Sequence, residues 1–440
     1  MAEINTKVLS GFMELLPHEQ LEFDRIKSII LATYQQFGYT PLDTPVIERS
    51  EVLLAKGSQE TDKQVYFVQN GLVSDKADAL AMRFDLTIPL ARYVAQHFNE
   101  LAFPFKRCHI GKAYRGERAQ KGRFREFYQC DIDVIGKDAL SIHYDAELPA
   151  IIYQLFKNLD FGKFTIRINN RKIFNGLFAH LKLADKKADI LRLIDKAEKI
   201  GHDKFLDELS KFDLSEGQLS KLLKFLAIKG DASAVLSTLG ILMDELSIDS
   251  NAFAEGLDEL AAVVDTMLKM GVNPDYFTID LSIVRGLDYY TGTVYETTLD
   301  NYDIGSICSG GRYDNLAGHY SSQKLPGVGI SIGLTRLFWQ LMDAGIISPA
   351  SKTVAKLLIL PQSIGNVDAA ISAASSLRAC GHNVDVFLED INMKKKLQYA
   401  ARIDAPYVIV ARDNGLSLQY KRDDEIIKEM LTVDEIISKI

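Results

Sequence analysis

The chain has 440 residues, more than one hydrophobic core usually supports, so we expect roughly two or three domains. Hydrophobic residues make up 47% and charged residues 25%, a mix typical of globular proteins, and no apolar run approaches the ~18 residues of a membrane span. The net charge of −8 argues against a strongly basic nucleic-acid-binding protein, so any RNA would have to bind a local basic patch.

The N-terminal part of the chain mixes amphipathic helices with strand-like segments. The spacing of apolar residues predicts a helix from about Glu19 to Phe37, ended by Gly38. Residues 103–115 and 123–135 are predicted to form two antiparallel strands, joined by a polar turn that contains glycine. We therefore expect a long β-hairpin in the first part of the chain.

A helical segment follows, from residue 176 to residue 272. Its apolar residues recur at helical spacing, and strand-like runs return only at Tyr276. This pattern predicts a helical insertion into a larger domain that spans residues 1–345. Strands rich in glycine and tyrosine then lead to a helix that begins near Thr335.

The C-terminal part of the chain forms a separate unit in this prediction. Residues 346–355 contain proline and serine and are typical of a linker. The alternation of strand and helix across residues 356–440 predicts a small α/β domain with a largely parallel sheet. The predicted fold class is therefore α/β, with an antiparallel sheet flanked by helices, a helical insertion and a C-terminal α/β domain.

Cysteine usage and the first residues indicate the compartment. The four cysteines are far apart in the sequence and contain no C-x-x-C pair, which argues against a zinc ribbon or a disulfide framework. The chain does not open with a basic segment followed by an apolar one, so we expect no secretion signal. These features predict a cytoplasmic protein.

One face of the second hairpin strand carries polar and aromatic side chains. Side chains alternate between the two faces of a strand. The odd-numbered positions therefore share one face: Arg123, Arg125, Phe127, Gln129, Asp131 and Asp133. Between Lys106 and Glu126 the chain also holds eight Lys or Arg against two Glu, which makes a local basic patch. The alternative interpretation is a solvated sheet face with salt bridges.

A strand nearly without side chains on one face follows later in the chain. Gly327, Gly329, Ser331 and Gly333 alternate with apolar residues, so they share a face. Such a face favours a flat ligand close to the backbone, such as a purine ring, and Arg336 just beyond could reach its phosphates. The alternative is close packing against a neighbouring strand.

Two further segments combine arginine, aspartate and tyrosine. They are IVRGLDYYTGTVYE at residues 283–296 and SGGRYDNL at residues 309–316. Their rigid hydrogen-bonding groups suit a polar ligand, although tyrosines in strands also serve as core or interface residues.

Together these segments resemble the histidyl-tRNA synthetases, a family of class II aminoacyl-tRNA synthetases. The two segments just described are similar to the family's histidine-specific motifs. Residues 37–45, 114–133 and 327–336 resemble class II motifs 1, 2 and 3, and residues 82–93 resemble the amino-acid-binding segment. The resemblance runs in family order from about residue 9 to 340, and residues 356–440 stand where the family has its anticodon-binding domain.

The resemblance implies a reaction and its partners. The chain would join L-histidine to ATP, release pyrophosphate, and transfer the histidyl group to the 3′ end of histidine tRNA. ATP would be a substrate and would carry Mg²⁺, with no metal held in a cage of protein ligands. Because motif 1 lies at a subunit interface in class II synthetases, the resemblance also implies a homodimer. The lack of a long apolar run predicts no membrane partner.

The resemblance assigns phosphate and adenine contacts residue by residue. The catalytic residues would be three arginines, since the planar guanidinium suits phosphate oxygens: Arg115 and Arg285 at the α-phosphate, and Arg336 at the outer phosphates. Arg123 would join Arg336 there, Glu117 would face the adenine amino group, and Phe127 would stack on the base. Thr335 departs from the family, which usually has an acidic residue before this arginine.

The same comparison assigns the histidine and tRNA contacts. The α-amino group would be held by Asp85, Thr87 and Gln129. The imidazole would lie among Asp133, Tyr289, Tyr290 and Tyr313, and Arg115 and Arg285 would also contact the amino acid. Gln120 corresponds to a residue that contacts the extra 5′ guanosine of histidine tRNA.

Two other functions remain open at this point. Paralogues with the same core serve histidine biosynthesis as non-catalytic partners of an ATP phosphoribosyltransferase, but they typically lack an anticodon-binding domain. A class II synthetase for another amino acid is the second alternative, and the segment RGLDYYTGTVYE argues against it.

Overall fold

The computed structural model describes the chain except for residues 1–3, 56–63, 70–78, 119–121, 249, 284–289, 303–304, 315–316, 350–351 and 423–424. Two compact units are present, one made of residues 1–13 and 27–347 and the other of residues 14–26 and 348–440.

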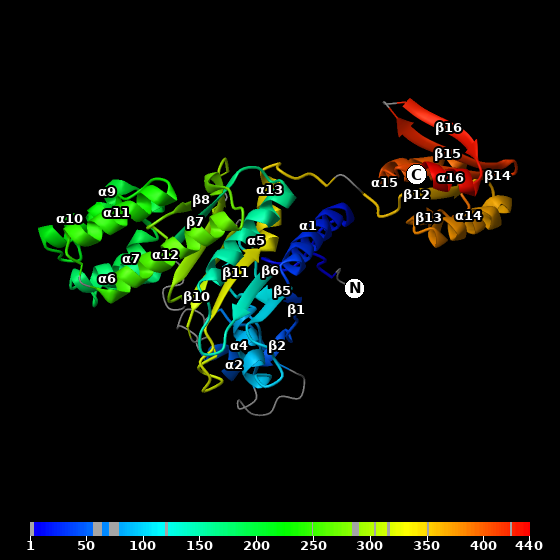
Figure 1. Ribbon diagram of the computed structural model, residues 1–440. Helices are drawn as coiled ribbons and strands as arrows, with labels where there is room; N and C mark the ends of the chain where they lie inside the picture. The colour runs from blue at the N-terminus through cyan, green and yellow to red at the C-terminus, as the bar shows by residue number, and fades with distance from the viewer. Residues whose placement is uncertain are drawn as a thin grey trace. The chain divides into compact units, whose positions relative to one another are not determined.

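An eight-stranded sheet forms the centre of the first unit, in the order β1-β5-β6-β11-β10-β9-β7-β8 (Figure 1). Neighbouring strands are antiparallel, except that β1 is parallel to β5 and β7 is parallel to β8. The strands are β1 (Thr40–Pro41), β5 (Phe105–Tyr114), β6 (Glu126–Ile135), β7 (Phe164–Asn170), β8 (Phe277–Ile279), β9 (Thr293–Leu299), β10 (Cys308–Tyr313) and β11 (Gly327–Gly333).

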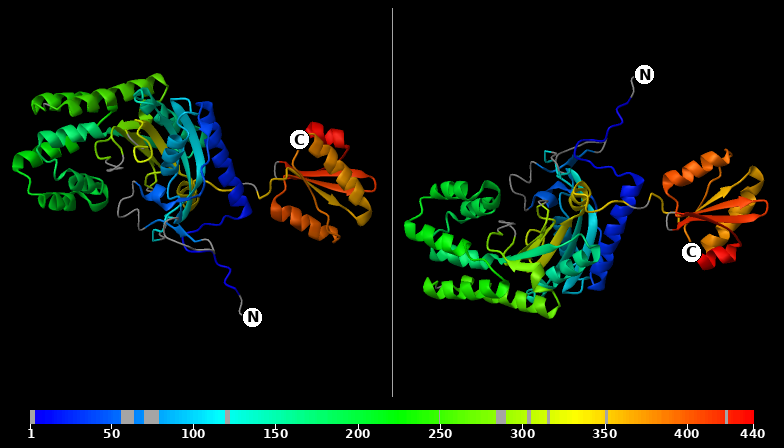
Figure 2. Two further views of the ribbon diagram at one scale, coloured as in Figure 1. Left: turned by 90° about the horizontal axis from the view of Figure 1, so that it is seen from below. Right: turned by 90° about the horizontal axis from the view of Figure 1, so that it is seen from above.

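The predicted hairpin is present as β5 and β6, paired from Phe105 opposite Ile135 to Tyr114 opposite Glu126. Helices cover the face of the sheet that carries the even-numbered, apolar residues of β6 (Figure 2). Tyr34 of α1 (Pro17–Gln36) donates a hydrogen bond to the Cys130 carbonyl at 3.1 Å. Tyr295 donates one to the Asp145 carbonyl in α5 (His143–Leu159) at 2.7 Å. The odd-numbered face is therefore left for the site.

Helices occupy the segment between β7 and β8. They are α6 (Arg171–His180), α7 (Lys187–Ile194), α8 (Ala197–Ile200), α9 (His202–Ser210), α10 (Glu216–Leu226), α11 (Ala232–Glu245) and α12 (Asn251–Lys269), followed by the short 3₁₀ helix η2 (Pro274–Tyr276). The first of them begins at Arg171 rather than at 176, because the Asn170 side chain caps it by accepting the Lys172 backbone N–H at 2.9 Å. Glycines bring α6 and α12 close together: a Cβ on Gly176 would lie 2.6 Å from the Phe253 nitrogen.

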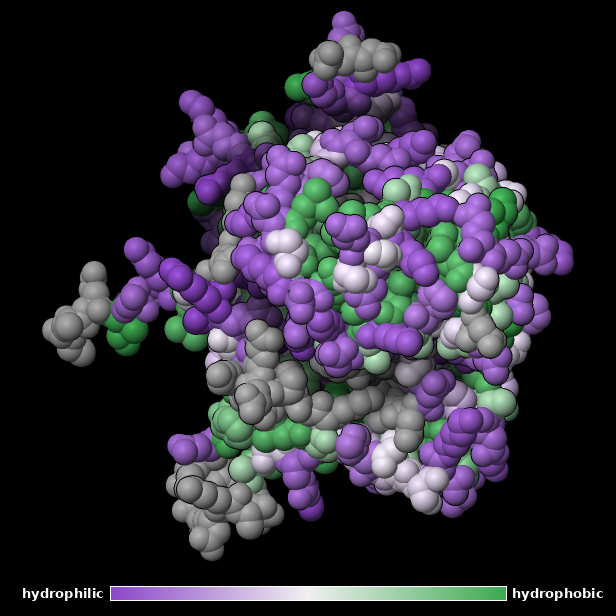
Figure 3. Space-filling model, turned by 90° about the vertical axis from the view of Figure 1, so that its left-hand side faces the viewer, coloured by the Kyte–Doolittle hydropathy of each residue, from purple (hydrophilic) through white to green (hydrophobic). Residues whose placement is uncertain are grey.

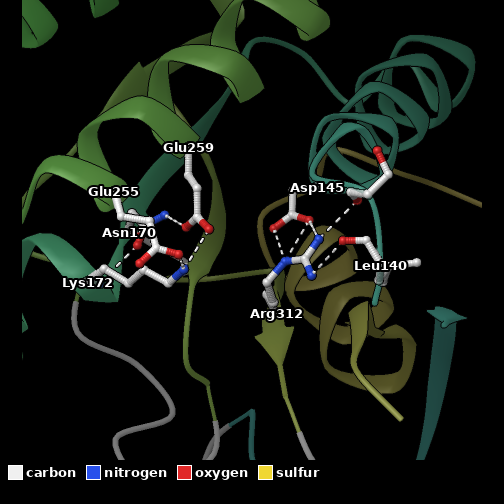
Figure 4. Close-up of polar contacts among 8 residues, drawn as sticks. Leu140, Asp145, Asn170, Lys172, Glu255, Glu259 and Arg312 are labelled. Atoms are coloured by element: carbon white, nitrogen blue, oxygen red, sulfur yellow. Dashed lines mark hydrogen bonds and ion pairs between the residues drawn. The ribbon is translucent and has the colours of Figure 1, made fainter. Parts of the chain in front are cut away.

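Two sets of ion pairs, drawn in Figure 4, join helix α6 to helix α12 and strand β10 to helix α5. Lys172 contacts Glu255 at 2.5 Å and Glu259 at 2.6 Å, both on α12. In the same view Arg312 of β10 faces Asp145 of α5, with a closest approach of 2.5 Å. The Arg312–Asp145 pair is buried, so it fixes β10 against α5 with little screening by solvent.

A smaller three-stranded sheet lies beside the large one, in the order β2-β4-β3. Its strands are β2 (Ile47–Arg49), β3 (Phe67–Val68) and β4 (Leu80–Met82), accompanied by α2 (Ser50–Leu54) and α4 (Thr87–Gln96). After β11 the chain turns directly into α13 (Leu334–Asp343), close to the predicted start at Thr335.

The second unit holds a five-stranded sheet in the order β13-β12-β14-β15-β16. Its strands are β12 (Leu357–Pro361), β13 (Val384–Val386), β14 (Tyr407–Arg412), β15 (Gly415–Arg422) and β16 (Glu425–Leu431). Its helices are η3 (Ile364–Asn366), α14 (Val367–Ala379), α15 (Met393–Ile403) and α16 (Val433–Lys439).

The prediction of a largely parallel sheet in this unit is wrong. β12 is parallel to β13 and β14, but β15 and β16 extend the sheet as antiparallel strands. The signal for the first antiparallel turn is present in the sequence: Asp413 and Asn414 form the turn, and Gly415 has a φ of +124°.

None of the helices in the described ranges is long and apolar enough to cross a membrane. Seen from the side of α9, α10 and α11, the surface is mostly hydrophilic, and hydrophobic residues are exposed in small groups among the polar ones (Figure 3).

Candidate functional site

A cavity of about 520 Å³ lies on the odd-numbered face of the large sheet, bounded by β6, β10, β11 and the start of α13. Many of the side chains that the sequence analysis assigned to substrates line it: Asp85, Thr87, Arg115, Glu117, Arg123, Phe127, Gln129, Tyr290 and Arg336. The lining also includes residues 306–309, at the start of β10, which were not predicted as ligands.

Arg115 is held over an aromatic ring at the end of the hairpin. Its guanidinium carbon lies 5.1 Å from the centre of the Phe127 ring, a cation–π contact between neighbouring strands. Its Nε donates a hydrogen bond to the Phe84 carbonyl at 3.0 Å. The guanidinium therefore has a fixed position at the cavity wall.

Glu117 and Arg123 lie on either side of the hairpin turn and form an ion pair of 3.4 Å. Arg125 supports this arrangement, since its Nε donates to the Glu117 carbonyl at 2.8 Å. The pair is partly exposed, so water screens it, and each partner remains available to a ligand in the cavity.

Arg336 extends into the cavity from the first turn of α13. The preceding residue, Thr335, is buried, and its hydroxyl accepts the Tyr128 backbone N–H at 2.8 Å. A neutral hydroxyl thus ties the start of α13 to β6 at the position where the resembling family usually has an acidic residue. The departure noted in the sequence leaves Arg336 anchored through the backbone of β6.

Asp85 and Thr87 stand where α4 begins. Asp85 Oδ1 accepts the backbone N–H groups of Thr87 at 3.2 Å and Ile88 at 2.9 Å. Burial raises the pKa of Asp85, and these hydrogen bonds and the nearby Arg115 oppose that shift because they stabilise the carboxylate. The carboxylate is thereby oriented as a fixed acceptor at the cavity edge.

The cavity floor carries amide and hydroxyl groups. Gln129 Nε2 donates to Ser331 Oγ at 3.0 Å, which joins β6 to β11. Gln129 Oε1 is buried and has no hydrogen-bond partner among the described residues. Burial raises the pKa of Tyr290, and the negative charges of Asp133 and Asp131 add to this effect, so its hydroxyl is neutral.

Asp133 and Tyr313 lie in the sheet beside this floor and are buried. The Tyr313 hydroxyl donates to Asp133 Oδ1 at 3.1 Å, and Arg107 Nη2 lies 2.7 Å from Asp133 Oδ2. Burial raises the pKa of Asp133, and Arg107 and the Tyr313 hydrogen bond oppose that shift. The alternative of a solvated sheet face is therefore wrong for this end of β6, which is closed to water.

The glycines of β11 serve two different purposes. A Cβ on Gly327 would collide with the Tyr313 ring, and one on Gly329 would collide with Asp133 Oδ1. The expectation of a purine over the whole stripe is thus wrong for these two positions, where side chains of the neighbouring strands fill the space. At Gly333 the nearest atom would be 3.9 Å away, and this residue lines the cavity.

Three predicted site residues fall outside the described residues: Arg285, Tyr289 and Gln120. Arg107, in contrast, was missed by the sequence analysis. It pairs directly with Asp133 across the β5–β6 ladder, a relation that depends on the register between the two strands. Within the described ranges, no group of three or more His, Cys, Asp or Glu side chains is placed to hold a metal ion.

The chain matches the family model described as histidyl-tRNA synthetase over residues 11–337, and the model described as anticodon binding domain over residues 356–440. It is 51% identical to the histidine–tRNA ligase of Clostridium tetani, with 98% of this chain and 95% of the relative covered. It is 45% identical to that of Xanthomonas campestris, with 99% and 96% covered. The crystal structure of histidyl-tRNA synthetase from Nostoc sp. PCC 7120 is similar with a TM-score of 0.91 at 38% identity, covering 99% of this chain and 100% of that chain. This agreement over the whole chain confirms the predicted fold class.

Proposed function

The chain belongs to the histidyl-tRNA synthetase family, and we propose that the cavity bounded by β6, β11 and α13 is where it joins L-histidine to ATP. The histidine carboxylate attacks the α-phosphorus, and the bond to pyrophosphate breaks. The histidyl group then passes from the adenylate to the 3′ end of histidine tRNA. The observation that carries this proposal is that Arg115 and Arg336, from distant parts of the chain, line one cavity with Asp85, Thr87 and Gln129.

Arginine side chains stabilise the charge that develops on phosphate in this reaction. Arg115 holds the α-phosphate, and we assign Arg285 to its opposite side. Arg336 and Arg123 hold the outer phosphates, to which the nucleotide brings Mg²⁺. In this proposal the protein contacts the phosphates through guanidinium groups. The ligands of Mg²⁺ would then be phosphate oxygens and water.

The adenine lies at the hairpin end of the cavity in this proposal. Phe127 stacks on the base and Glu117 accepts from its amino group. Phe127 already contacts the Arg115 guanidinium. One aromatic ring would then hold the base and the α-phosphate ligand in a fixed relation, which favours attack in the correct geometry.

Histidine binds beside the nucleotide. Asp85, Thr87 and Gln129 hold its α-amino group, with Arg115 and Arg285 at its carboxylate. Neutral imidazole has one donor and one acceptor nitrogen. The groups around the imidazole supply both kinds of partner: Asp133, Tyr289, Tyr290 and Tyr313.

The domain roles follow from the same assignment. We propose residues 1–345 as the class II catalytic domain, with a helical insertion at residues 176–272. Residues 346–355 link it to an anticodon-binding domain at residues 356–440. Gln120 contacts the extra 5′ guanosine of histidine tRNA.

We further propose a homodimer in the cytoplasm, where tRNA and ATP are both present. The interface forms through the segment at residues 37–45, which resembles class II motif 1. Activity should then fall on dilution below the dimer dissociation constant, as analytical ultracentrifugation and kinetics at matched concentrations would show. A monomer with full activity would contradict this assignment.

ATP–pyrophosphate exchange with each standard amino acid in turn tests the proposed function. Exchange with histidine alone is expected, and an Arg115→Lys variant should lose most of it. Exchange with another amino acid would contradict the assignment. No exchange would favour the non-catalytic regulatory paralogue, which the match of residues 356–440 to an anticodon-binding domain disfavours.

A further inference from the structure

We infer that Arg107 is a positioning residue that keeps Asp133 ionised and thereby sets the selectivity of the site for an imidazole N–H. This inference rests on the proposed assignment of Asp133 to the imidazole. It adds a residue of β5 that is not among the cavity-lining side chains and acts through its neighbour on β6.

The geometry places one cation between two carboxylates. Arg107 lies opposite Asp133 in the β5–β6 ladder, and Asp131 is two residues away on the same face. Arg107 Nη2 is 2.7 Å from Asp133 Oδ2 and 4.0 Å from Asp131 Oδ2. All three side chains are buried, with relative exposures of 0% for Arg107, 2% for Asp131 and 3% for Asp133.

The other described groups that face this pair carry no compensating positive charge. His109 lies opposite Asp131 in the ladder, but burial and the nearby Arg107 and Arg83 lower its pKa to about 3, so it is neutral. Tyr313 and Tyr290 face Asp133 with neutral hydroxyls, because their pKa values are raised by burial and by the carboxylate. Asp85 adds a further negative charge near Asp131. In the part of the chain that the structure describes, Arg107 is therefore the cation that lies against this carboxylate pair.

Two buried carboxylates this close cannot both remain ionised without a counter-charge. Without the charge of Arg107 both buried carboxylates would favour the protonated form, so Asp133 as well as Asp131 would lose its character as a charged acceptor. An imidazole N–H would then face a neutral acid in place of a carboxylate, a much weaker partner for a donor. The charge of Arg107 thus becomes part of histidine recognition.

Polar atoms without hydrogen-bond partners distinguish the Arg107–Asp131–Asp133 cluster from an ion pair that only stabilises the fold. Arg107 Nε, Arg107 Nη1 and Asp131 Oδ1 are buried without a hydrogen-bond partner among the described residues. A buried ion pair stabilises a fold only when its remaining donors and acceptors are satisfied. The cluster of Arg107, Asp131 and Asp133 therefore lowers the stability of the fold, and this cost favours a role for the cluster in ligand binding.

The test is the KM for histidine of an Arg107→Met variant in pyrophosphate exchange across a range of pH. At neutral pH we expect this KM to rise at least about tenfold, while the KM for ATP changes less than about twofold. The ratio of variant to wild-type KM should fall as pH rises, because Asp133 ionises again. Taking the ratio at each pH removes the titration of free histidine itself. A histidine KM equal to wild type at every pH would overturn the inference, as would a parallel rise for ATP.

Two variants serve as controls. Arg312→Met breaks another buried arginine–aspartate pair, which joins β10 to Asp145 of α5, and should lower the melting temperature without a pH-dependent KM ratio. Arg107→Lys keeps the charge and should retain a ratio that does not depend on pH. If the lysine variant behaves like the methionine variant, charge is not the cause and the inference fails.

A charge-neutral pair of variants covers the case in which Arg107→Met does not fold. Arg107→Met/Asp131→Asn removes one charge of each sign and is compared with Asp131→Asn alone. The double variant should have the higher histidine KM, and the difference should shrink as pH rises. Equal values would overturn the inference. Failure of the wild-type chain to exchange with histidine would instead remove the proposed function on which it rests.

Discussion

The Tyr313 hydroxyl reaches Asp133 across an intervening strand and donates a hydrogen bond to its Oδ1 at 3.1 Å. Tyr313 lies on β10 and Asp133 on β6, and β11 runs between them. The two side chains meet because Gly327 and Gly329 of β11 have no side chains that would occupy the space between them. The glycine-rich strand β11 therefore makes room for the buried Tyr313–Asp133 contact and also contributes to the cavity wall.

Substitution of the residues proposed to contact the imidazole should change the KM for histidine much more than the KM for ATP. Asp133→Ala and Tyr290→Phe should each raise the KM for histidine at least about tenfold and leave the KM for ATP nearly unchanged, because a polar pocket with an unpaired group discriminates strongly. Tyr295→Phe is the matched control, since that hydroxyl binds the Asp145 carbonyl on the other face. It should cost stability only. Equal losses for both substrates would count against the assignment.

The two roles of the β11 glycines predict a split between Gly329→Ala and Gly333→Ala. A methyl group on Gly329 displaces Asp133, so histidine activation should be lost or the protein destabilised by several kcal/mol, at about the upper end of single substitutions. A methyl group on Gly333 would make only an ordinary van der Waals contact with Arg336, so Gly333→Ala should fold normally. It should nevertheless raise the KM for ATP, because the methyl group would extend into the cavity. Thermal unfolding and KM values for both substrates check this pair. A Gly333→Ala variant with wild-type ATP kinetics would contradict an adenine at this position.

The planar donor geometry of Arg115 and Arg336 should contribute to catalysis in addition to their positive charge. Arg115→Lys and Arg336→Lys keep a positive charge but lose the planar set of donors, so kcat for exchange should fall about 10²-fold or more. Arg92 lies outside the cavity and pairs with Glu48, so kcat of an Arg92→Lys variant should fall less than about threefold. Pre-steady-state measurement of adenylate formation reports the chemical step. Comparable losses in all three variants would show that the effect is structural.

Thr335→Val removes the acceptor of the Tyr128 backbone N–H while keeping the shape of the side chain. Leaving that partly buried N–H without its acceptor should cost about 1–3 kcal/mol of stability. Because the hydroxyl anchors the first turn of α13, kcat should fall more than the affinity for ATP as Arg336 loses its fixed position. Thr335→Ser should restore both quantities. A serine variant no better than valine would exclude the hydrogen bond as the cause.

Stability should depend on pH through Asp131, whose pKa burial raises to about 7 from an ordinary value of 3.8. Between these values the folded state holds a proton that the unfolded state has lost, so the wild type loses stability as pH rises from about 4 to about 7. Asparagine does not titrate. Asp131→Asn should therefore stabilise more at about pH 8 than at about pH 5, by at most roughly 3 kcal/mol, because about two pH units of the interval lie between these values. His109 titrates in both chains, so the difference in thermal unfolding between them isolates Asp131. An equal difference at both pH values would contradict this.

The sequence predicted the fold where the signals are local. The hairpin of β5 and β6 combines strict alternation with a glycine-containing turn, and α1 ends just before Gly38, whose φ is +80°. The β15–β16 pair was missed because its strands lie after the last buried strand and carry many exposed polar side chains. The start of α6 was placed late, since the cap at Asn170 sits inside a segment with strand-like composition.

The site was predictable only in part for a related reason. Parity along β6 grouped Phe127 and Gln129, which do line the cavity. The contact of Arg107 with Asp133 depends on the register between two strands, which no single-strand pattern contains. The roles of Gly327 and Gly329 depend on side chains from β10 and β6, so the face of β11 alone could not distinguish a ligand from packing.

A crystal structure with a non-hydrolysable analogue of histidyl-adenylate tests the central claim most directly. We expect the group that replaces the α-phosphate to accept hydrogen bonds from Arg115, with Arg336 directed into the same space. We also expect the purine on Phe127 and the imidazole between Asp133 and Tyr290. An analogue bound elsewhere, or bound here with its imidazole away from Asp133, would contradict this claim.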